Sequence, residues 1–128
     1  MKILLDTHAL LWLITGDERL SETARKTFIN SENLLYFSIA SLWEICIKKS
    51  LKKISLKKGW LQIIQEEMKK NTIQWLPVEI EHCAKVIEIP FHHRDPFDRM
   101  LIAQSMSEGL TILSRDSRFK SYTVKCIW

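Results

Sequence analysis

The feature that most constrains the fold is the alternation of short apolar runs with longer segments of helical periodicity. The apolar runs predict buried strands at Ile3–Leu5, Leu35–Phe37, Ile73–Leu76, Leu110–Leu113 and Val124–Ile127. The helical segments are Thr7–Ile14, Ser21–Ser31, Ala40–Leu51, Lys58–Lys70, Glu79–Glu88 and Phe97–Glu108. Strands that alternate with helices form parallel sheets. We therefore predict an α/β three-layer sandwich, in which a parallel sheet of about five strands carries helices on both faces.

The composition indicates one globular domain over residues 1–128. The chain has 128 residues, of which 46% are hydrophobic, and a chain of this size buries a substantial core. An odd count of three scattered cysteines indicates a reducing compartment rather than a disulfide framework. The apolar stretch Ile3–Ile14 is interrupted by Asp6 and His8, so neither a signal peptide nor a membrane span is predicted. We expect a cytoplasmic protein, and its net charge of +4 favours anionic partners such as nucleic acid.

Acidic residues follow the predicted strands. Asp6, Glu44 and Asp116 each lie just past the end of a predicted strand. The carboxyl ends of parallel strands share one edge of the sheet, and ligand sites form in the crevice at that edge. Asp98, at the start of a predicted helix, can point to the same edge. The sequence therefore predicts a site built on these four carboxylates.

Helix capping explains each of these acids equally well when it is taken alone. Asp6 is suited to the N-cap of the helix that follows it, and Asp116 to a cap or an Asx turn. Ser41 and Glu44 have the spacing of a capping box. Ser38 is an alternative start for that helix, which leaves Glu44 free. The case for a site therefore depends on the four acids converging.

The segment Asp95-Pro96-Phe97-Asp98 offers two acids for one role. Proline is favoured at the first position of a helix, which makes Asp95 the natural N-cap. Asp98 then falls in the first turn, where negative charge is favoured by the helix dipole. We assign Asp98 to the site because Asp95 is needed as the cap; the alternative is that Asp95 is the ligand and Asp98 supports it.

Four carboxylates in one crevice require neutralisation. Two unit charges about 4 Å apart repel by on the order of 4 kcal/mol at an effective dielectric constant of 20. Protons or cations relieve this repulsion, and ligands that offer only oxygen atoms select hard cations such as Mg²⁺ or Mn²⁺. Such ions bind phosphates and lower the pKa of water. The chemistry indicated is hydrolysis of phosphodiester bonds.

Four stretches of this sequence are similar to one protein family. They are Leu4-Leu5-Asp6-Thr7-His8-Ala9, Ser38-Ile39-Ala40-Ser41-Leu42-Trp43-Glu44-Ile45, His93-Arg94-Asp95-Pro96-Phe97-Asp98-Arg99-Met100-Leu101-Ile102-Ala103-Gln104 and Ile112-Leu113-Ser114-Arg115-Asp116. In this order, and over essentially the whole chain, they resemble the PIN-domain ribonucleases, specifically the VapC-type toxins of toxin–antitoxin pairs. The resemblance places the acidic residues of the family on Asp6, Glu44, Asp98 and Asp116. It implies Mg²⁺- or Mn²⁺-dependent cleavage of single-stranded RNA, a homodimer, and a cognate antitoxin that covers the site.

Other residues are candidates for supporting roles. Arg94 and Arg99 flank the acids, where they could hold a phosphate or pair with a carboxylate, and Thr7 and Ser114 are further candidates to support the acids or contact RNA. The densest basic stretch is either a surface for RNA phosphates or simply a solvated helix face; it comprises Lys48, Lys49, Lys52, Lys53, Lys57 and Lys58. The alternative function is therefore a non-catalytic RNA-binding or partner-binding module on the same fold.

Overall fold

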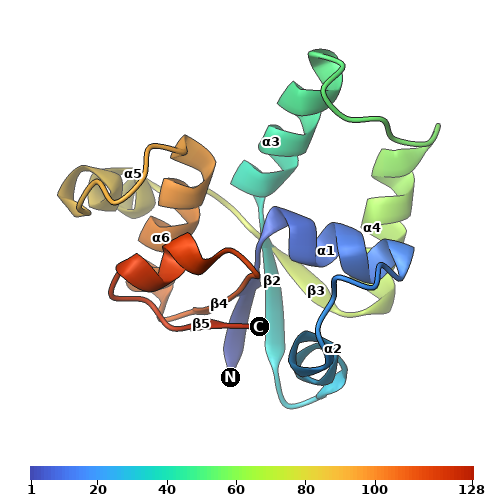
Figure 1. The fold of residues 1–128 in the computed structure, drawn as a ribbon, viewed down its shortest axis with the longest axis horizontal. Coiled ribbons are helices and arrows are strands. Elements are labelled where there is room, and N and C mark those ends of the chain that lie inside the picture. Colours follow the sequence, from blue (N-terminus) through green and yellow to red (C-terminus); the bar gives the residue numbers. More distant parts are fainter.

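The structure is a computed structural model that describes all residues from Met1 to Trp128, and a five-stranded sheet forms its centre (Figure 1). The strands are β1 (Lys2–Leu5), β2 (Leu34–Ser38), β3 (Ile73–Leu76), β4 (Thr111–Leu113) and β5 (Cys126–Ile127). Their order in the sheet is β3-β2-β1-β4-β5, and every neighbouring pair is parallel. The predicted fold class and the five strands are confirmed, although β5 is shorter than the predicted Val124–Ile127.

Helices cover both faces of the sheet, as predicted. They are α1 (Thr7–Thr15), α2 (Glu22–Ile29), α3 (Ile39–Ser50), α4 (Trp60–Lys70), α5 (Ile80–Glu88) and α6 (Pro96–Glu108), with a short 3₁₀ helix η1 (Ser117–Ser121) before β5. Figure 1 shows α1, α2 and α4 on one side of the sheet and α5, α6 and η1 on the other. None of these helices has the length and hydropathy required to span a membrane.

Alternation along the central strand divides the core into two layers. Ile3 and Leu5 of β1 pack into one cluster, together with Leu10 of α1 and Ala24 of α2. Leu4 points to the other face and packs into a second cluster that includes residues of α6. All three β1 side chains are at most 1% exposed, because parallel strands are covered on both faces. The central strand is therefore firmly held at the point where the chain leaves the sheet.

Local signals fix where α6 begins and ends. The Asp95 carboxylate accepts hydrogen bonds from the backbone N–H groups of Phe97 (2.9 Å) and Asp98 (3.0 Å), and Pro96 is the first helical residue. Gly109 ends the helix with a φ of 66°, a left-handed conformation that favours glycine. The predicted cap is thus confirmed, and it places Asp98 in the first turn of α6.

Candidate active site

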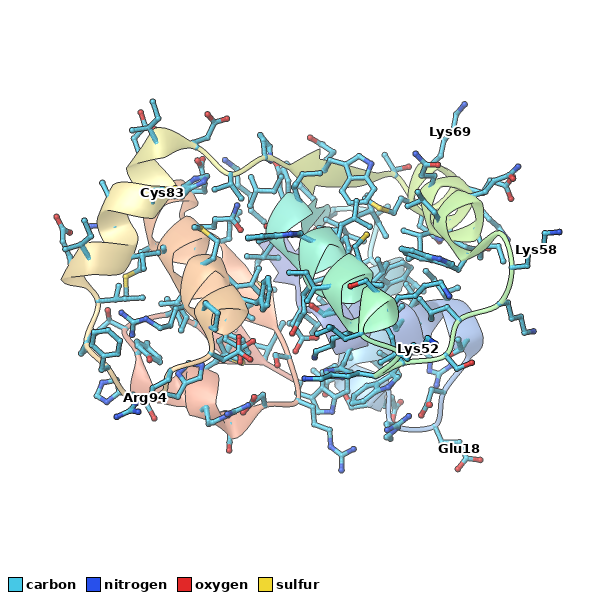
Figure 2. All side chains as sticks on the ribbon, turned by 90° about the horizontal axis from the view of Figure 1, so that it is seen from above. Glu18, Lys52, Lys58, Lys69, Cys83 and Arg94 are labelled. Carbon is cyan, nitrogen blue, oxygen red and sulfur yellow. The ribbon has the colours of Figure 1, made fainter.

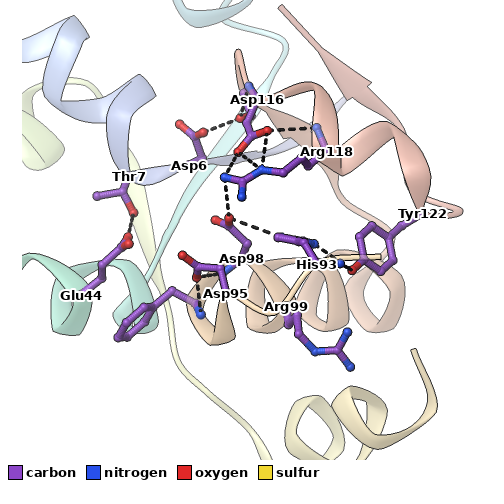
Figure 3. A network of polar contacts seen from close by, with 12 residues as sticks. Asp6, Thr7, Glu44, His93, Asp95, Asp98, Arg99, Asp116, Arg118 and Tyr122 are labelled. Carbon is purple, nitrogen blue, oxygen red and sulfur yellow. Dashed lines mark hydrogen bonds and ion pairs between the residues drawn. The ribbon is translucent and has the colours of Figure 1, made fainter. Parts of the chain in front are cut away.

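A polar cleft lies at the carboxyl end of the sheet. It has a volume of about 470 Å³ and only one hydrophobic lining residue. The residues that line it are Asp6, Thr7, His8, Trp12, Glu44, Lys48, Asp95, Asp98, Arg115, Asp116, Ser117 and Arg118. All four predicted acids therefore face one space, although they come from four separate segments of the chain. Figure 3 shows the polar contacts that hold them.

Asp6 follows directly on β1 and is held by two neutral donors. Its backbone N–H donates to the Leu113 carbonyl (3.1 Å), which continues the pairing of β1 with β4. One carboxylate oxygen accepts from the Ala9 N–H (2.7 Å), and the other accepts from the Ser114 hydroxyl. Burial raises the pKa of Asp6 because it disfavours the charged form. Asp6 is therefore both the cap of α1 and a buried acid of the cleft.

Glu44 lies inside α3, one turn from its start. The helix is capped by Ser38, whose hydroxyl accepts from the Ala40 N–H (3.0 Å), so the capping box of Ser41 with Glu44 is not formed. One oxygen of Glu44 accepts from the Thr7 hydroxyl (2.7 Å), and the other lies 3.0 Å from the Lys48 ammonium. The start of α3 at Ser38 thus leaves the Glu44 side chain available to the cleft.

Asp98 lies in the first turn of α6 and has a strongly raised pKa. Burial raises the pKa of its carboxyl to about 7, and the charges of Asp95, Glu44 and Asp116 act in the same direction. Only 18% of its side chain is exposed. The neighbouring Arg118 guanidinium offsets part of this rise, because opposite charge favours the ionised form.

Asp116 is paired with a residue two positions along the chain. Its carboxylate accepts from the Arg118 N–H (2.9 Å), which caps η1. The Arg118 guanidinium binds the same carboxylate through Nε and Nη2, with a shortest distance of 2.7 Å. These bonds lower the pKa of Asp116. The same Nη2 atom lies 3.8 Å from Asp98 (Figure 3), so the guanidinium connects two of the acids.

A buried histidine supports Asp98 from behind. The Nδ1 atom of His93 is 2.8 Å from the Tyr122 hydroxyl, which also accepts from the His93 backbone N–H (3.2 Å). If the Tyr122 hydroxyl donates to Nδ1, the hydrogen of the neutral ring lies on Nε2. Nε2 is buried, lies 3.4 Å from the Asp98 carboxylate and makes no hydrogen bond. Burial lowers the pKa of His93.

Two predicted supporting residues are in the site and two are not. Thr7 and Ser114 donate to the acids as expected. Arg99 is a correction: its guanidinium is turned away from the cleft and donates to the carbonyls of Val86, Ile89 and Pro90 (Figure 3). It therefore joins α6 to the end of α5.

Arg94 is exposed and does not line the cleft, and Figure 2 shows it at the end of the molecule opposite Lys58. A contact between Arg94 and RNA stays a prediction. The residues that sequence reasoning missed are Arg118 and His93. The only available signal for Arg118 was its spacing of two residues from Asp116, which suits an Asx turn.

The donor chemistry of the cleft fits a hard divalent cation. Its acids offer only oxygen atoms, the type of ligand that Mg²⁺ and Mn²⁺ prefer. Burial is the main reason that the pKa values of Asp6 and Asp98 are raised, and the charge of Asp116 adds to both rises. No three side chains among the histidines, cysteines, aspartates and glutamates form a ready cluster for a metal ion. The acids that would hold such an ion therefore line one cleft, but no three of them are already arranged around an ion site.

The rim of the cleft has the opposite charge from its floor. Lys48, Arg115 and Arg118 line it, and His8 and Trp12 form a side wall with ring centroids 5.5 Å apart. Basic side chains attract phosphates, and aromatic rings accept bases. An acidic floor with a basic rim can receive a polyanion whose reacting group must meet a cation.

Comparison with protein families gives one match that covers nearly the whole chain. The model of the PIN domain matches residues 3–125. No curated protein sequence matches the chain. The family match includes all four acids of the cleft.

Solved structures of toxin–antitoxin proteins share the fold. A chain of VapBC2 from Rickettsia felis, bound to a promoter DNA fragment, has a TM-score of 0.75 at 12% identity, covering 99% of this chain and 98% of that one. For DNA-bound VapBC from Salmonella typhimurium the TM-score is 0.70 at 16% identity, with coverages of 99% and 97%. For FitAcB from Neisseria gonorrhoeae it is 0.65 at 17% identity, with coverages of 98% and 96%. At these identities the likeness establishes a common fold.

Proposed function

This chain belongs to the PIN domain family, and we propose that it is a divalent-metal-dependent endoribonuclease that cleaves single-stranded RNA as the toxin of a toxin–antitoxin pair. One observation carries the proposal: Asp6, Glu44, Asp98 and Asp116 come from four segments and line one polar cleft with a basic rim. Helix capping needs only one acid at each helix end, so capping does not explain why four acids gather in one cleft. It suits the binding of a cation and a phosphodiester.

In this proposal the four carboxylates hold Mg²⁺ or Mn²⁺. An ion held by these residues would neutralise the acids and the phosphate and would lower the pKa of a water molecule. Asp6 and Glu44 are fixed in advance by the hydroxyls of Ser114 and Thr7. The Ser114 hydroxyl orients Asp6 without cancelling its charge, whereas one oxygen of Glu44 also pairs with the Lys48 ammonium at 3.0 Å.

The residues at the rim orient the substrate. Lys48, Arg115 and Arg118 line the cleft, and their positive charge would draw the phosphates of RNA toward the acids. Trp12 and His8 form the wall beside this entrance. A single strand can follow such a narrow groove with its bases splayed against aromatic rings.

We further propose a cognate antitoxin, a homodimer and a cytoplasmic location. The support is the shared fold with chains of VapBC and FitAcB complexes. Co-expression with the product of a neighbouring short reading frame, followed by size-exclusion chromatography with light scattering, tests both assembly claims. Failure to co-purify and a monomeric mass would contradict them, and neither result bears on the nuclease activity.

The test of the activity is cleavage of a labelled single-stranded RNA by purified protein with Mg²⁺. We expect cleavage that EDTA abolishes and that Asp6→Asn strongly reduces. Asp17→Asn is the matched control, because Asp17 pairs with Arg19 on the surface and does not line the cleft. Circular dichroism confirms that both variants are folded. Equal cleavage by wild type and Asp6→Asn would sink the proposal.

A specific observation keeps the binding module as a second candidate. Lys52, Lys53, Lys57 and Lys58 are exposed and make no ion pair, so their charge is free for phosphates. RNA binding that is salt-sensitive, persists without the four acids and produces no cleavage would favour this function. Substitution of these lysines by glutamine would then abolish binding.

A further inference from the structure

Arg118 occupies the space between two acids of the cleft. Its guanidinium binds Asp116 through two nitrogen atoms, at 2.7 to 3.1 Å, and lies 3.8 Å from the Asp98 carboxylate. Figure 3 shows the group between Asp116 on one side and Asp98 on the other. A single positive charge thus stands where two carboxylates face each other.

This position leaves no free carboxylate oxygen on Asp116. Both oxygen atoms of Asp116 are occupied by Arg118, one of them also by its backbone N–H. A cation that is to bind Asp98 and Asp116 together must therefore replace the guanidinium. The two cations compete for the same lone pairs, because a carboxylate oxygen has few free directions once a bidentate arginine is bound.

Arg118 is also able to leave. Its side chain is 58% exposed, against 18% for Asp98 and 29% for Asp116. It contacts no other acid, and it extends from a short 3₁₀ helix at the rim of the cleft. Rotation of the side chain into solvent does not disturb the core, whereas Arg99, which is buried against three carbonyls, has no such freedom.

We propose that Arg118 is an internal counter-ion that holds Asp98 and Asp116 in the metal-free protein and is displaced when a divalent cation binds. The inference rests on the proposed function in one respect, that the cleft takes a divalent cation. It goes further by identifying Arg118 as a residue that regulates this binding. The net free energy of ion binding is the free energy that the carboxylates gain from the ion minus the free energy of the contacts with Arg118 that they lose.

The test is isothermal titration of Mn²⁺ into wild type, Arg118→Gln and Arg115→Gln. Arg115 is the matched control, since it lines the same cleft but makes no ion pair with the acids. We expect Arg118→Gln to bind Mn²⁺ about tenfold more tightly than wild type, from the loss of one nearby positive charge and one competing ligand. Arg115→Gln, which removes the charge alone, should change the affinity by about twofold or less.

A conservative variant separates charge from geometry. Arg118→Lys keeps the charge but loses the bidentate fork, so its Mn²⁺ affinity should lie between those of wild type and Arg118→Gln. An affinity of Arg118→Gln equal to that of Arg115→Gln, or below wild type, overturns the inference while leaving the metal site in place. Absence of Mn²⁺ binding in every protein overturns both the inference and the metal dependence of the proposed function.

Discussion

The two sides of the cleft hold their acids by different means. The inner half contains Asp6 and Glu44, each 7% exposed, which accept hydrogen bonds from the hydroxyls of Ser114 and Thr7. The outer half contains Asp98 and Asp116, which are more open and lie against the charged Arg118. Each inner acid accepts a hydrogen bond from a hydroxyl, and Glu44 also pairs with Lys48 along its own helix. The two outer acids instead share one exposed guanidinium, so the contacts of the inner half are more buried than those of the outer half.

Activity should depend more steeply on the inner half than on the outer half. We expect Asp6→Asn to lower single-turnover RNA cleavage by on the order of 10³-fold, because a preset charge in a dry position is lost. Asp116→Asn, which removes an acid already paired with Arg118, should cost about 10-fold to 100-fold. Cleavage rates at saturating Mg²⁺ measure both, and equal losses would break the distinction between the halves.

The outer half should make the metal-free protein sensitive to pH. The pKa of Asp98 is raised to about 7, so the folded protein holds a proton that the unfolded chain releases near pH 4. The stability from this proton is complete below pH 4 and is lost as pH rises through 7. Wild type should therefore lose stability relative to Asp98→Asn between pH 5 and pH 8, by about 2 kcal/mol after allowance for partial solvent access.

Urea unfolding in EDTA at the two pH values measures this difference. Saturating Mg²⁺ should remove the loss of wild-type stability between pH 5 and pH 8, because the cation replaces the proton on Asp98. A difference between wild type and Asp98→Asn that is the same at pH 5 and pH 8 would mean that the Asp98 carboxyl is not destabilised by its surroundings.

The hydroxyl that joins the two halves should matter moderately. Ser114 donates to Asp6 and accepts from the Asp116 N–H. Ser114→Ala should reduce stability by about 1 to 2 kcal/mol, since a buried carboxylate loses a donor. Ser117→Ala is the matched control, because Ser117 lines the same cleft and is exposed. Thermal or urea unfolding measures both; a loss of stability in the control alone would contradict the assignment.

The smallest effect is expected at the edge of the inner half. Lys48 pairs with Glu44 one helical turn away, at 3.0 Å, and 39% of its side chain is exposed. Pairs of this kind contribute under about 1 kcal/mol. Lys48→Gln should therefore leave urea unfolding nearly unchanged at 0.15 M salt. A loss of more than about 2 kcal/mol in the free energy of unfolding would show that this pair contributes more than an exposed ion pair does.

Much of the inner half could be predicted from the sequence, because it follows from the backbone. The ends of β1 and β4 are set by apolar runs, and parallel pairing then brings Asp6 and Ser114 to one edge. One part of the outer half could be predicted as well: the proline next to Asp95 indicates the cap, and the cap places Asp98 in the first turn of α6. Capping is compatible with a place in the cleft, because Asp6 and Asp116 each cap a helix and line the cleft.

The outer half was less predictable, because long side chains determine it. Arg99 follows Asp98 directly, yet one residue along a helix is a rotation of about 100°, so it points to α5 and away from the cleft. The sequence predicts a cap or an Asx turn at Asp116, but not that the 3₁₀ helix after it brings the Arg118 guanidinium to within 3.8 Å of Asp98. The Tyr122 hydroxyl holds the ring of His93, and no local spacing indicates a contact between residues 29 positions apart.

The bond between Ser114 and Asp6 spans 108 positions of the chain. The order in which the chain is synthesised therefore determines when the cleft can form. A ribosome produces β1 first, but the strand has no partner on the β4 side until residues 111–113 have emerged, and Arg118 comes later still. A nascent chain carries its first acid long before it carries a complete cleft. The four acids can therefore line one cleft only when translation is nearly finished.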